Sequence, residues 1–316
     1  MDKNFRTKVN ISPCEWKIDY QSRLISFGSC FSTNIGSKLE NAYFQIDVNP
    51  FGVLFNPVSI VESIKLLLSK TTFTENDIFE ANSLWNSFCF STLFSDTTLE
   101  NTLNKINSRF VAAQNNFQLS DIVLITFGTA WVYEDIESAA VVANCHKLPS
   151  NRFRRRRLST DEIVATYKDI LQLFPQKKFI FTVSPIRHFK DGATENNRSK
   201  AVLLLAIEQI TEQFANSFYF PAYEIVNDEL RDYRFYSPDM LHPSTVAIDY
   251  IWERFGETFF DSTTEQTKQE LENFYAQVSH RPIHPNSEQS NLFRQDLDNK
   301  KKLLLAKYPF LRRMED

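Results

Sequence analysis

Apolar runs of strand length alternate with helical patterns along most of this chain. Residues 121–127 and 178–183 are largely apolar, which is typical of strands buried on both faces of a parallel sheet. This alternation predicts a three-layer α/β/α fold with a mostly parallel, doubly wound sheet. Further strands are expected at 23–28, 43–48 and around 219–220, and helices at 33–42, 58–69, 97–115, 160–173, 196–214, 222–231 and 245–260.

Three segments lie outside this alternation. Residues 1–22 are interpreted as a leader that packs on the surface, with Trp16 as its anchor. Residues 84–94 are expected to contain a strand pair, and 132–134 with 139–143 a hairpin. These segments connect or cover the predicted sheet without extending it.

The last part of the chain is more polar than the rest. Two helical stretches are expected there, at 263–278 and 289–306. We therefore predict an α/β domain over residues 1–260 and a helical appendage over 261–316.

Charge and cysteine usage narrow the class of protein. The formal net charge of −4 and the pI near 5.8 argue against nucleic-acid binding. The N-terminus shows no apolar leader, and the longest apolar run, 202–207, is too short to cross a membrane. The four cysteines, at positions 14, 30, 89 and 145, form no CxxC pair, so we expect reduced thiols and a cytoplasmic location. No cofactor and no metal site is expected.

A glycine turn ends the first predicted strand. Gly28 is followed by Ser29 and Cys30, and the next helix is expected to begin within a few residues. Such a turn places small polar side chains and free backbone N–H groups at the carboxyl edge of the sheet, where ligands bind in open α/β folds. We therefore predict that Ser29 and Cys30 mark the centre of the chemistry.

Other polar residues follow the ends of the other predicted strands. Because parallel strands end at the same edge, these side chains should gather there. Asp239 stands three residues before His242, so its carboxylate can hold one ring nitrogen and leave the other facing a nucleophile. A nucleophile, a base and a carboxylate at one edge predict acyl transfer. The residues concerned are Ser29, Cys30, Gly52, Gly128, Thr129, Ser184, Arg187, His188, Asp239 and His242.

Five separated motifs resemble the GSCFA-domain family, which is similar to a distant branch of the SGNH/GDSL hydrolases. They are FGSCFS at 27–32, GTAW at 128–131, NCHK at 144–147, SPIRH at 184–188 and DMLHPS at 239–244. The resemblance covers about residues 23–260. It implies a flavodoxin-like sheet of the SGNH-hydrolase type, whereas the GSCFA family itself implies no defined reaction.

The resemblance to those hydrolases implies catalytic roles for particular residues. Their Gly-Asp-Ser turn corresponds to residues 28–30, which puts Cys30 in the place of the nucleophile and Ser29 in that of the aspartate. Their Asp-x-x-His motif corresponds to Asp239 and His242. Cys30 as a buried packing residue, and Ser29 as the nucleophile, remain alternatives.

The same resemblance implies an oxyanion hole that lacks one expected donor. Gly52 corresponds to the glycine whose N–H is one donor, whereas Ala130 replaces the asparagine that supplies the other. Thr129 or Asn144 is the expected substitute. Losing a donor costs about a hundredfold or more in rate, so this replacement weakens the inference of a hydrolase.

Three groups of residues are candidates for substrate binding. We predict that His146, Arg187 and His188 face the substrate. The alternatives are that His146 makes structural hydrogen bonds and that Arg187 and His188 lie in a solvated loop. The arginine run at 152 and 154–157 either pairs with acidic neighbours or docks an anionic group. The aromatic residues of 71–95 either fill the core or line an acyl pocket.

Three hypotheses for function follow. The leading one is an acyl-ester hydrolase that uses Cys30, His242 and Asp239 on a small-molecule or glycan ester. The second is an O-acyltransferase that moves an acyl group from acyl-CoA to a glycan. The third is a binding module without catalysis, which Ala130 favours.

Overall fold

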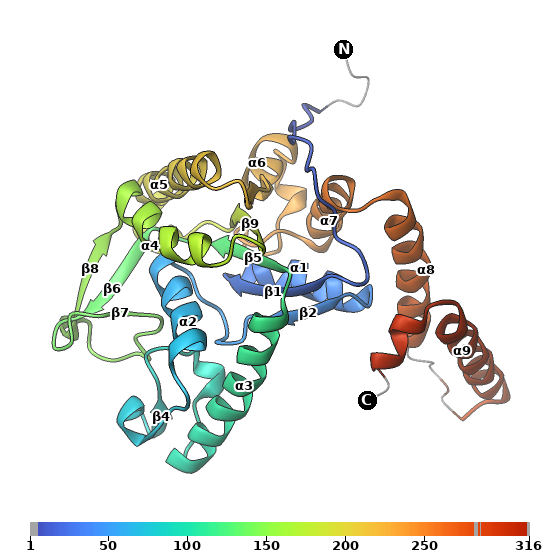
Figure 1. Ribbon diagram of the computed structural model, residues 1–316, viewed down its shortest axis with the longest axis horizontal. Helices are drawn as coiled ribbons and strands as arrows, with labels where there is room; N and C mark the ends of the chain where they lie inside the picture. The colour runs from blue at the N-terminus through green and yellow to red at the C-terminus, as the bar shows by residue number, and fades with distance from the viewer. Residues whose placement is uncertain (1–5, 281–283, 285, 315–316) are drawn as a thin grey trace.

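The computed structural model describes residues 6–280, 284 and 286–314 of the chain (Figure 1). Its centre is a sheet of five parallel strands in the order β10-β9-β5-β1-β2. Counted from the other edge, this is the 2-1-3-4-5 order of flavodoxin-like folds, so the predicted fold class is confirmed. The strands are β1 (Arg23–Gly28), β2 (Gln45–Val48), β5 (Ile122–Phe127), β9 (Lys178–Val183) and β10 (Ser217–Tyr219).

Helices cover both faces of the sheet (Figure 1). On β5, the side chains of Val123 and Ile125 pack into one core cluster and that of Leu124 into the other, as the alternation of side chains along a strand requires. The first cluster lies under α2 (Pro57–Ser69), α3 (Leu99–Leu119), α4 (Thr160–Leu173) and α5 (Gly192–Gln213). The second lies under α1 (Cys30–Asn41) and α7 (Thr245–Phe259). Both faces are apolar, as the continuous apolar runs predicted.

Two small antiparallel sheets stand beside the main one. The first pairs β3 (Phe79–Ala81) with β4 (Leu84–Asn86), so residues 84–94 contribute one strand instead of the expected pair. The second joins β7 (Val141–Val142), β6 (Trp131–Asp135) and β8 (Phe153–Arg157), which confirms the predicted hairpin. Sequence analysis missed β8, because its arginine-rich sequence has no apolar alternation.

Several helix boundaries differ from expectation near the predicted site. Helix α1 begins at Cys30, three residues early, because Ser29 takes the N-cap position. Helix α5 begins at Gly192 instead of 196. The helix expected at 222–231 is one turn, α6 (Ala222–Glu224), continued by a π-helical stretch, Ile225–Glu229.

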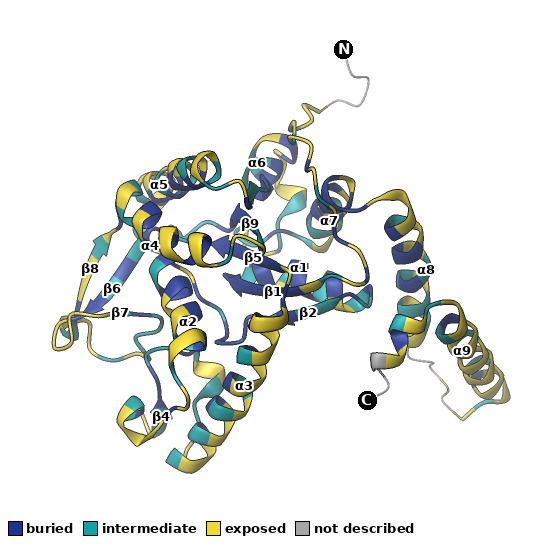
Figure 2. Cartoon of the chain, in the orientation of Figure 1, coloured by how far each residue is buried: buried dark blue, intermediate teal, exposed yellow. Residues whose placement is uncertain are grey.

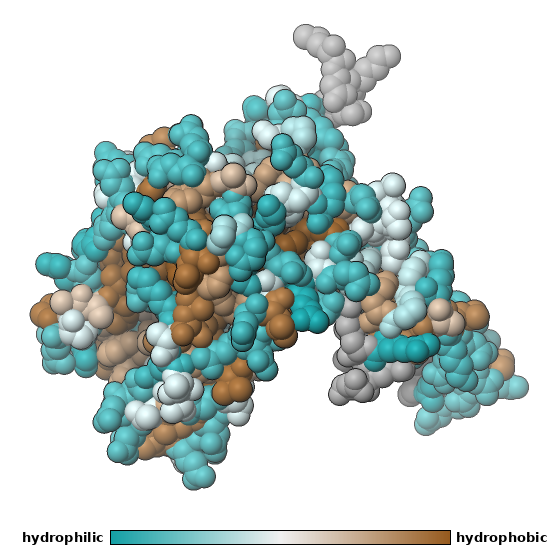
Figure 3. Space-filling model, in the orientation of Figure 1, coloured by the Kyte–Doolittle hydropathy of each residue, from teal (hydrophilic) through white to brown (hydrophobic). Residues whose placement is uncertain are grey.

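The terminal segments pack around α7. Trp16 stacks on Phe259 with ring centroids 5.6 Å apart, so it anchors the N-terminal segment as predicted, although residues 1–5 lie outside the described part. The two expected C-terminal helices are present as α8 (Ser262–Val278) and α9 (Glu288–Lys307). Figure 2 shows that α9 is mostly exposed, and Figure 3 shows that its visible side is hydrophilic. Within the described residues, no helix is long and apolar enough to span a bilayer.

Candidate functional site

Backbone hydrogen bonds tie together the segments that follow β1 and β5. Leu54 N–H donates to the carbonyl of Gly28 at 2.9 Å. The N–H groups of Gly128 and Thr129 both donate to the carbonyl of Phe55, at 2.8 and 2.9 Å. The glycine turn, the loop that contains Gly52 and the end of β5 therefore form one hydrogen-bonded edge, where the sequence placed the site.

The turn after β1 requires glycine and buries the first of its two polar residues. Gly28 has φ of +148°, and a Cβ there would lie 2.4 Å from the carbonyl oxygen of Thr126. Ser29 occupies the N-cap position of α1 and is 2% exposed, but its hydroxyl has no hydrogen-bond partner among the described residues. A Cβ on Gly128 would lie 3.3 Å from the Cβ of Ser29, so this side chain lies against the end of β5.

Cys30, the first residue of α1, is the accessible member of the turn. It is half-buried against the core cluster under α1 and α7. Burial raises the pKa of its thiol. A hydrogen bond from its own backbone N–H lowers the pKa, but by less. The thiol is therefore protonated at neutral pH, and it reacts as a nucleophile only if a base removes the proton.

Asp239 and His242 form the predicted pair in the loop before α7. Nδ1 of His242 lies 2.6 Å from Oδ2 of Asp239. The other carboxylate oxygen accepts the N–H groups of Leu241 and His242, at 2.9 and 3.0 Å. These three bonds lower the pKa of Asp239 to about 2, so the carboxylate is charged at any physiological pH.

The loop around this pair is held by its own backbone. Met240 adopts φ of +59°, which turns the chain tightly enough for one carboxylate to reach both N–H groups. Ser237 N–H donates to the carbonyl of His242 at 2.7 Å. Pro243 precedes the N-cap Ser244 and so lies outside the first turn of α7.

The thiol and the imidazole are not in direct contact. Among the described residues, no hydrogen bond joins Cys30 to His242. Cys30 begins α1, whereas His242 lies in the loop before α7; these two helices pack together, and Lys38 of α1 forms an ion pair with Asp249 of α7 at 2.5 Å. A bond between the thiol and the imidazole requires the two groups to approach each other, and catalytic bonds often tighten only when substrate binds.

Of the expected oxyanion donors, Gly52 and Asn144 are engaged in the fold, whereas the hydroxyl of Thr129 accepts a hydrogen bond and can still donate one. Gly52 is buried with φ of +76°, and its N–H donates to the carbonyl of Asn49 at 2.7 Å. Thr129 Oγ1 accepts the N–H of Trp131 at 3.1 Å. Asn144 donates from Nδ2 to Thr92 and accepts the N–H of His146. By contrast, the N–H of Cys30 opens α1 and has no carbonyl one turn earlier to bond.

The predicted substrate-facing residues occupy different environments. His146 is 5% exposed, and its Nε2 lies 2.8 Å from the carbonyl oxygen of Ser87, so it packs inside the loop. Arg187 donates to Asn197 and Asn227. The phenylalanines of 71–95 largely fill the core, with Phe90 only 1% exposed.

His188 lies between the cavity described below and the His242 loop. Its ring contacts Phe55 edge-on, with centroids 5.7 Å apart. Burial is the main reason that its pKa falls to about 4, and the charges of Lys200 and His242 lower it further. His188 is therefore neutral at physiological pH.

Sequence analysis missed a buried lysine beneath this edge. Lys200 of α5 is 1% exposed, and its Nζ donates to the carbonyls of Gly128 and Ser184, both at 2.7 Å. Burial lowers its pKa to about 7, with a smaller effect of Arg187. The sequence does indicate this burial, because Lys200 stands three residues before Leu203 and so lies on the same, apolar face of the helix.

Lys200 has polar neighbours on α5 that bind the same two loops. Ser199 Oγ accepts the N–H of Ala130 at 2.7 Å and lies 3.1 Å from Thr129 Oγ1. Asn196 accepts the N–H of His188 at 2.9 Å. The first turns of α5 thus fix the loops after β5 and β9 relative to each other.

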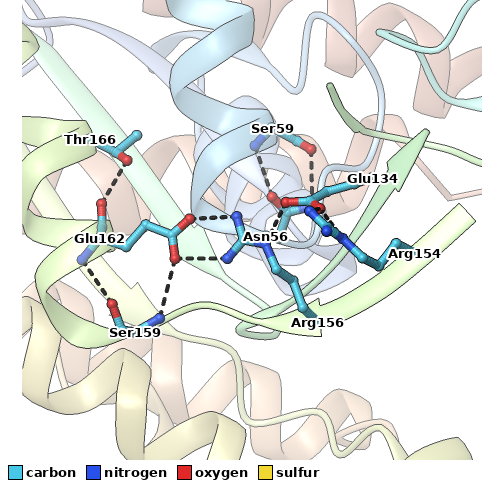
Figure 4. A network of polar contacts seen from close by, with 8 residues as sticks. All are labelled: Asn56, Ser59, Glu134, Arg154, Arg156, Ser159, Glu162 and Thr166. Carbon is cyan, nitrogen blue, oxygen red and sulfur yellow. Dashed lines mark hydrogen bonds and ion pairs between the residues drawn. The ribbon is translucent and has the colours of Figure 1, made fainter. Parts of the chain in front are cut away.

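The arginine run on β8 is paired with carboxylates along its length. Arg154 and Arg156 both contact Glu134, and Arg156 also binds Glu162 at 2.6 Å (Figure 4). Arginine hydrogen bonds lower the pKa of Glu134. The other three guanidinium groups pair as Arg152 with Asp135, Arg155 with Asp191 and Arg157 with Glu195. The structure therefore supports pairing with acidic neighbours over a free patch of positive charge.

A cavity of about 290 Å³ lies beside the edge of the sheet. It is bounded by β6, by Arg155 of β8, by Phe55 and Thr129, and by the turn that contains His188. Asn144 also lines it, and among the described lining residues none comes from 71–95. The aromatic segment therefore does not form this cavity.

Comparison with known proteins identifies the family of this chain. Two solved structures are similar to it: a variant of an acetyl-xylooligosaccharide esterase from Geobacillus Stearmophilus (13% identity, TM-score 0.41, covering 78% of this chain and 97% of that one) and a carbohydrate esterase family 3 protein from Talaromyces cellulolyticus (10%, 0.35, 78% and 99%). No match was found among curated proteins. The family model described as GSCFA family matches residues 23–255. The chain therefore belongs to the GSCFA family, as its motifs predicted.

Proposed function

We propose that this chain is an acyl-ester hydrolase in which Cys30 is the nucleophile, His242 the general base and Asp239 the residue that orients it. The observation that carries the proposal is the 2.6 Å contact between His242 and Asp239. His242 acts electrostatically on His188 in the loop after β9, which supports a place for the pair near the carboxyl edge of the sheet. The substrate class is a small-molecule or glycan acyl ester.

The first half-reaction would follow from this arrangement. The Sγ of Cys30 attacks the ester carbonyl carbon, and Nε2 of His242 takes the thiol proton. Asp239 accepts the Nδ1–H bond, which keeps the lone pair on Nε2 and stabilises the imidazolium. When the tetrahedral intermediate collapses, the alkoxide leaves with that proton and an acyl-thioester remains on Cys30.

The second half-reaction returns the protein to its starting state. His242 removes a proton from water as the water attacks the thioester carbonyl. The carboxylic acid is released, and Sγ recovers the proton from the imidazolium. The N–H of Cys30 would donate to the oxyanion in both steps, and the hydroxyl of Thr129 is the second proposed donor.

Accessibility supports Cys30 over Ser29. The serine is 2% exposed and lies against Gly128, whereas the cysteine is only half-buried. A nucleophile must reach a carbonyl carbon at about 3–3.5 Å. The greater exposure of the cysteine therefore favours it over the serine as the nucleophile.

Variants of Cys30 and of His242 test the assignment. Cys30→Ala and His242→Ala should each lower the hydrolysis of p-nitrophenyl esters and acyl-CoAs by at least about a hundredfold. Cys14→Ala is the matched control, because Cys14 interacts with Lys178 at the start of β9 and so lies at the opposite edge of the sheet. Full activity of Cys30→Ala would refute the assignment.

A binding module without catalysis is the second candidate. The raised pKa of Cys30 and the engaged N–H of Gly52 favour it, together with the missing asparagine at Ala130. It predicts ligand binding without turnover by the wild-type protein.

An O-acyltransferase remains a prediction without a structural observation of its own. The arginine run that suggested acyl-CoA binding is paired with carboxylates. If the prediction is right, adding a sugar acceptor should accelerate loss of the acyl donor.

A further inference from the structure

The cavity beside β6 has a wall that is rich in hydrogen-bond donors. Trp131 and Tyr133 stand on β6, and Arg155 lies opposite Tyr133 on β8. The Arg155 guanidinium carbon lies 4.2 Å from the centre of the Trp131 ring. This stacking fixes the guanidinium plane at the cavity wall.

The charge on this wall is positive. Arg155 pairs with Asp191 at 2.6 Å, and Asp191 is the only carboxylate among the described residues that line the cavity. Lys190 also lines it and makes no ion pair within the described part of the chain. One arginine and one lysine against one aspartate leave a net charge of +1.

Two nitrogen atoms at the wall lack hydrogen-bond partners. The Nε1 of Trp131 and the Nε2 of His188 are both buried without one in the described structure. An indole N–H can only donate, so a group that satisfies it must be an acceptor. Leaving such a donor unpaired is unfavourable, and an acceptor brought by a ligand would satisfy it. Both side chains line the cavity and are only partly buried.

The cavity adjoins the residues of the proposed reaction. Thr129 lines it and directly follows Gly128, which lies against Ser29. His188 lines it from the other side and interacts electrostatically with His242. Residues that line the cavity thus neighbour the glycine turn on one side and interact with the imidazole on the other.

We propose that this cavity binds an oxyanion carried by the substrate, with Arg155 and Lys190 as its cationic partners. Trp131 supplies an additional donor. The cavity's chemistry fits either a carboxylate on an acidic sugar or a phosphate on an acyl carrier. The claim that the oxyanion belongs to the substrate rests on the proposed hydrolase function. The claim that the cavity binds an oxyanion is independent of that function.

Binding to the Cys30→Ala protein tests the site without any turnover. The probes are D-glucuronate for the carboxylate, coenzyme A for the phosphate, and D-glucose as the neutral control, each titrated by calorimetry at low and high salt. We expect one charged probe to bind at least about tenfold more tightly than glucose, since hydrogen bonds to charged groups are stronger than those to neutral groups. Salt should weaken that binding. The probe that binds identifies the source of the oxyanion.

Matched variants locate the binding. Arg155→Gln should lower the affinity for the charged probe by about tenfold. Lys190→Met, at an exposed position, should lower it by about threefold. Arg154→Gln is the control, because Arg154 is also on β8 but pairs with Glu134 away from the cavity. Equal binding of glucose and both charged probes would overturn the proposal. So would an unchanged affinity in Lys190→Met and Arg155→Gln, or a loss in Arg154→Gln as large as in Arg155→Gln.

Because these titrations need no hydrolysis, their failure is distinct from the failure of the proposed function. Charged-probe binding by a protein that hydrolyses no ester would support the cavity and refute the reaction. Ester hydrolysis without charged-probe binding would support the reaction and refute the cavity.

Discussion

Nδ1 of His242 lies 2.6 Å from Oδ2 of Asp239, while the other oxygen of the same carboxylate accepts two backbone N–H groups. The carboxylate therefore has a fixed orientation before any substrate arrives. A fixed acceptor at Nδ1 determines which ring nitrogen carries the proton, and so leaves Nε2 as the base. This relationship is the firmest part of the candidate site.

Replacing Asp239 with asparagine tests that role. Asp239→Asn keeps the size of the side chain but removes the charge, and an amide in this place favours the wrong tautomer. We expect kcat for ester hydrolysis to fall by about a thousandfold or more, with KM little changed. Steady-state kinetics on a p-nitrophenyl ester measure both. A change in KM alone would indicate a binding role.

The thiol of Cys30 should react slowly at neutral pH. Burial raises its pKa, so the thiolate fraction increases only as the pH rises above the ordinary thiol value of about 8.5. The rate of iodoacetamide labelling of Cys30 against pH, read by peptide mass spectrometry, measures this. A midpoint well below the ordinary value would mean that a positive group lies close to the sulfur, contrary to the described geometry.

Lys200 should make stability depend on pH in the alkaline range. Its pKa is about 7 in the folded protein and about 10.4 in the unfolded chain, so between these values the unfolded chain binds more protons. Stability from this group therefore rises with pH across that window, by at most about 1.4 kcal/mol per unit. Urea unfolding at pH 7, 8 and 9 measures the free energy of unfolding of the wild type and of Lys200→Met. As the pH rises, the value for the wild type should increase relative to that for the variant. A pH-independent difference would show that the pKa is not lowered.

Gly52 should resist substitution for two separable reasons. Its φ of +76° disfavours any side chain, and a Cβ would lie 1.9 Å from the Oγ of Ser91. Gly52→Ala should cost at least about 2 kcal/mol in the free energy of unfolding. Adding Ser91→Gly should recover the part that is due to the clash and leave about 1–2 kcal/mol from the backbone. No recovery in the double variant would mean that the strain lies in the backbone alone.

The main sheet and its helices follow from local patterns. The strand at 178–183 and the helix at 160–173 were predicted at their observed bounds, because each has a continuous apolar run or clear capping residues. Ser159 caps that helix in a reciprocal pair with Glu162. The position of the Asp239 and His242 pair could also be predicted, since its contacts span only three residues.

The rest of the site depends on contacts between distant parts of the chain. Strand β8 pairs with β6, where Arg154 and Arg156 meet Glu134, some twenty residues earlier. His146 packs inward because its partner is the carbonyl of Ser87. Lys200 binds Gly128, 72 positions away. No local pattern contains these pairs, so the sequence alone could not place them.

The most direct test of the central claim is to trap the acyl-enzyme. Wild-type protein, in which His242 can remove the thiol proton, is mixed with p-nitrophenyl acetate, quenched in acid during turnover, digested and analysed by mass spectrometry, with Cys30→Ala protein treated in parallel. The account predicts a single acetyl group on the Cys30 side chain, absent from the Cys30→Ala protein. An acetyl group on Ser29, or no peptide acetylated above the Cys30→Ala background while the wild-type protein hydrolyses the ester, would contradict it.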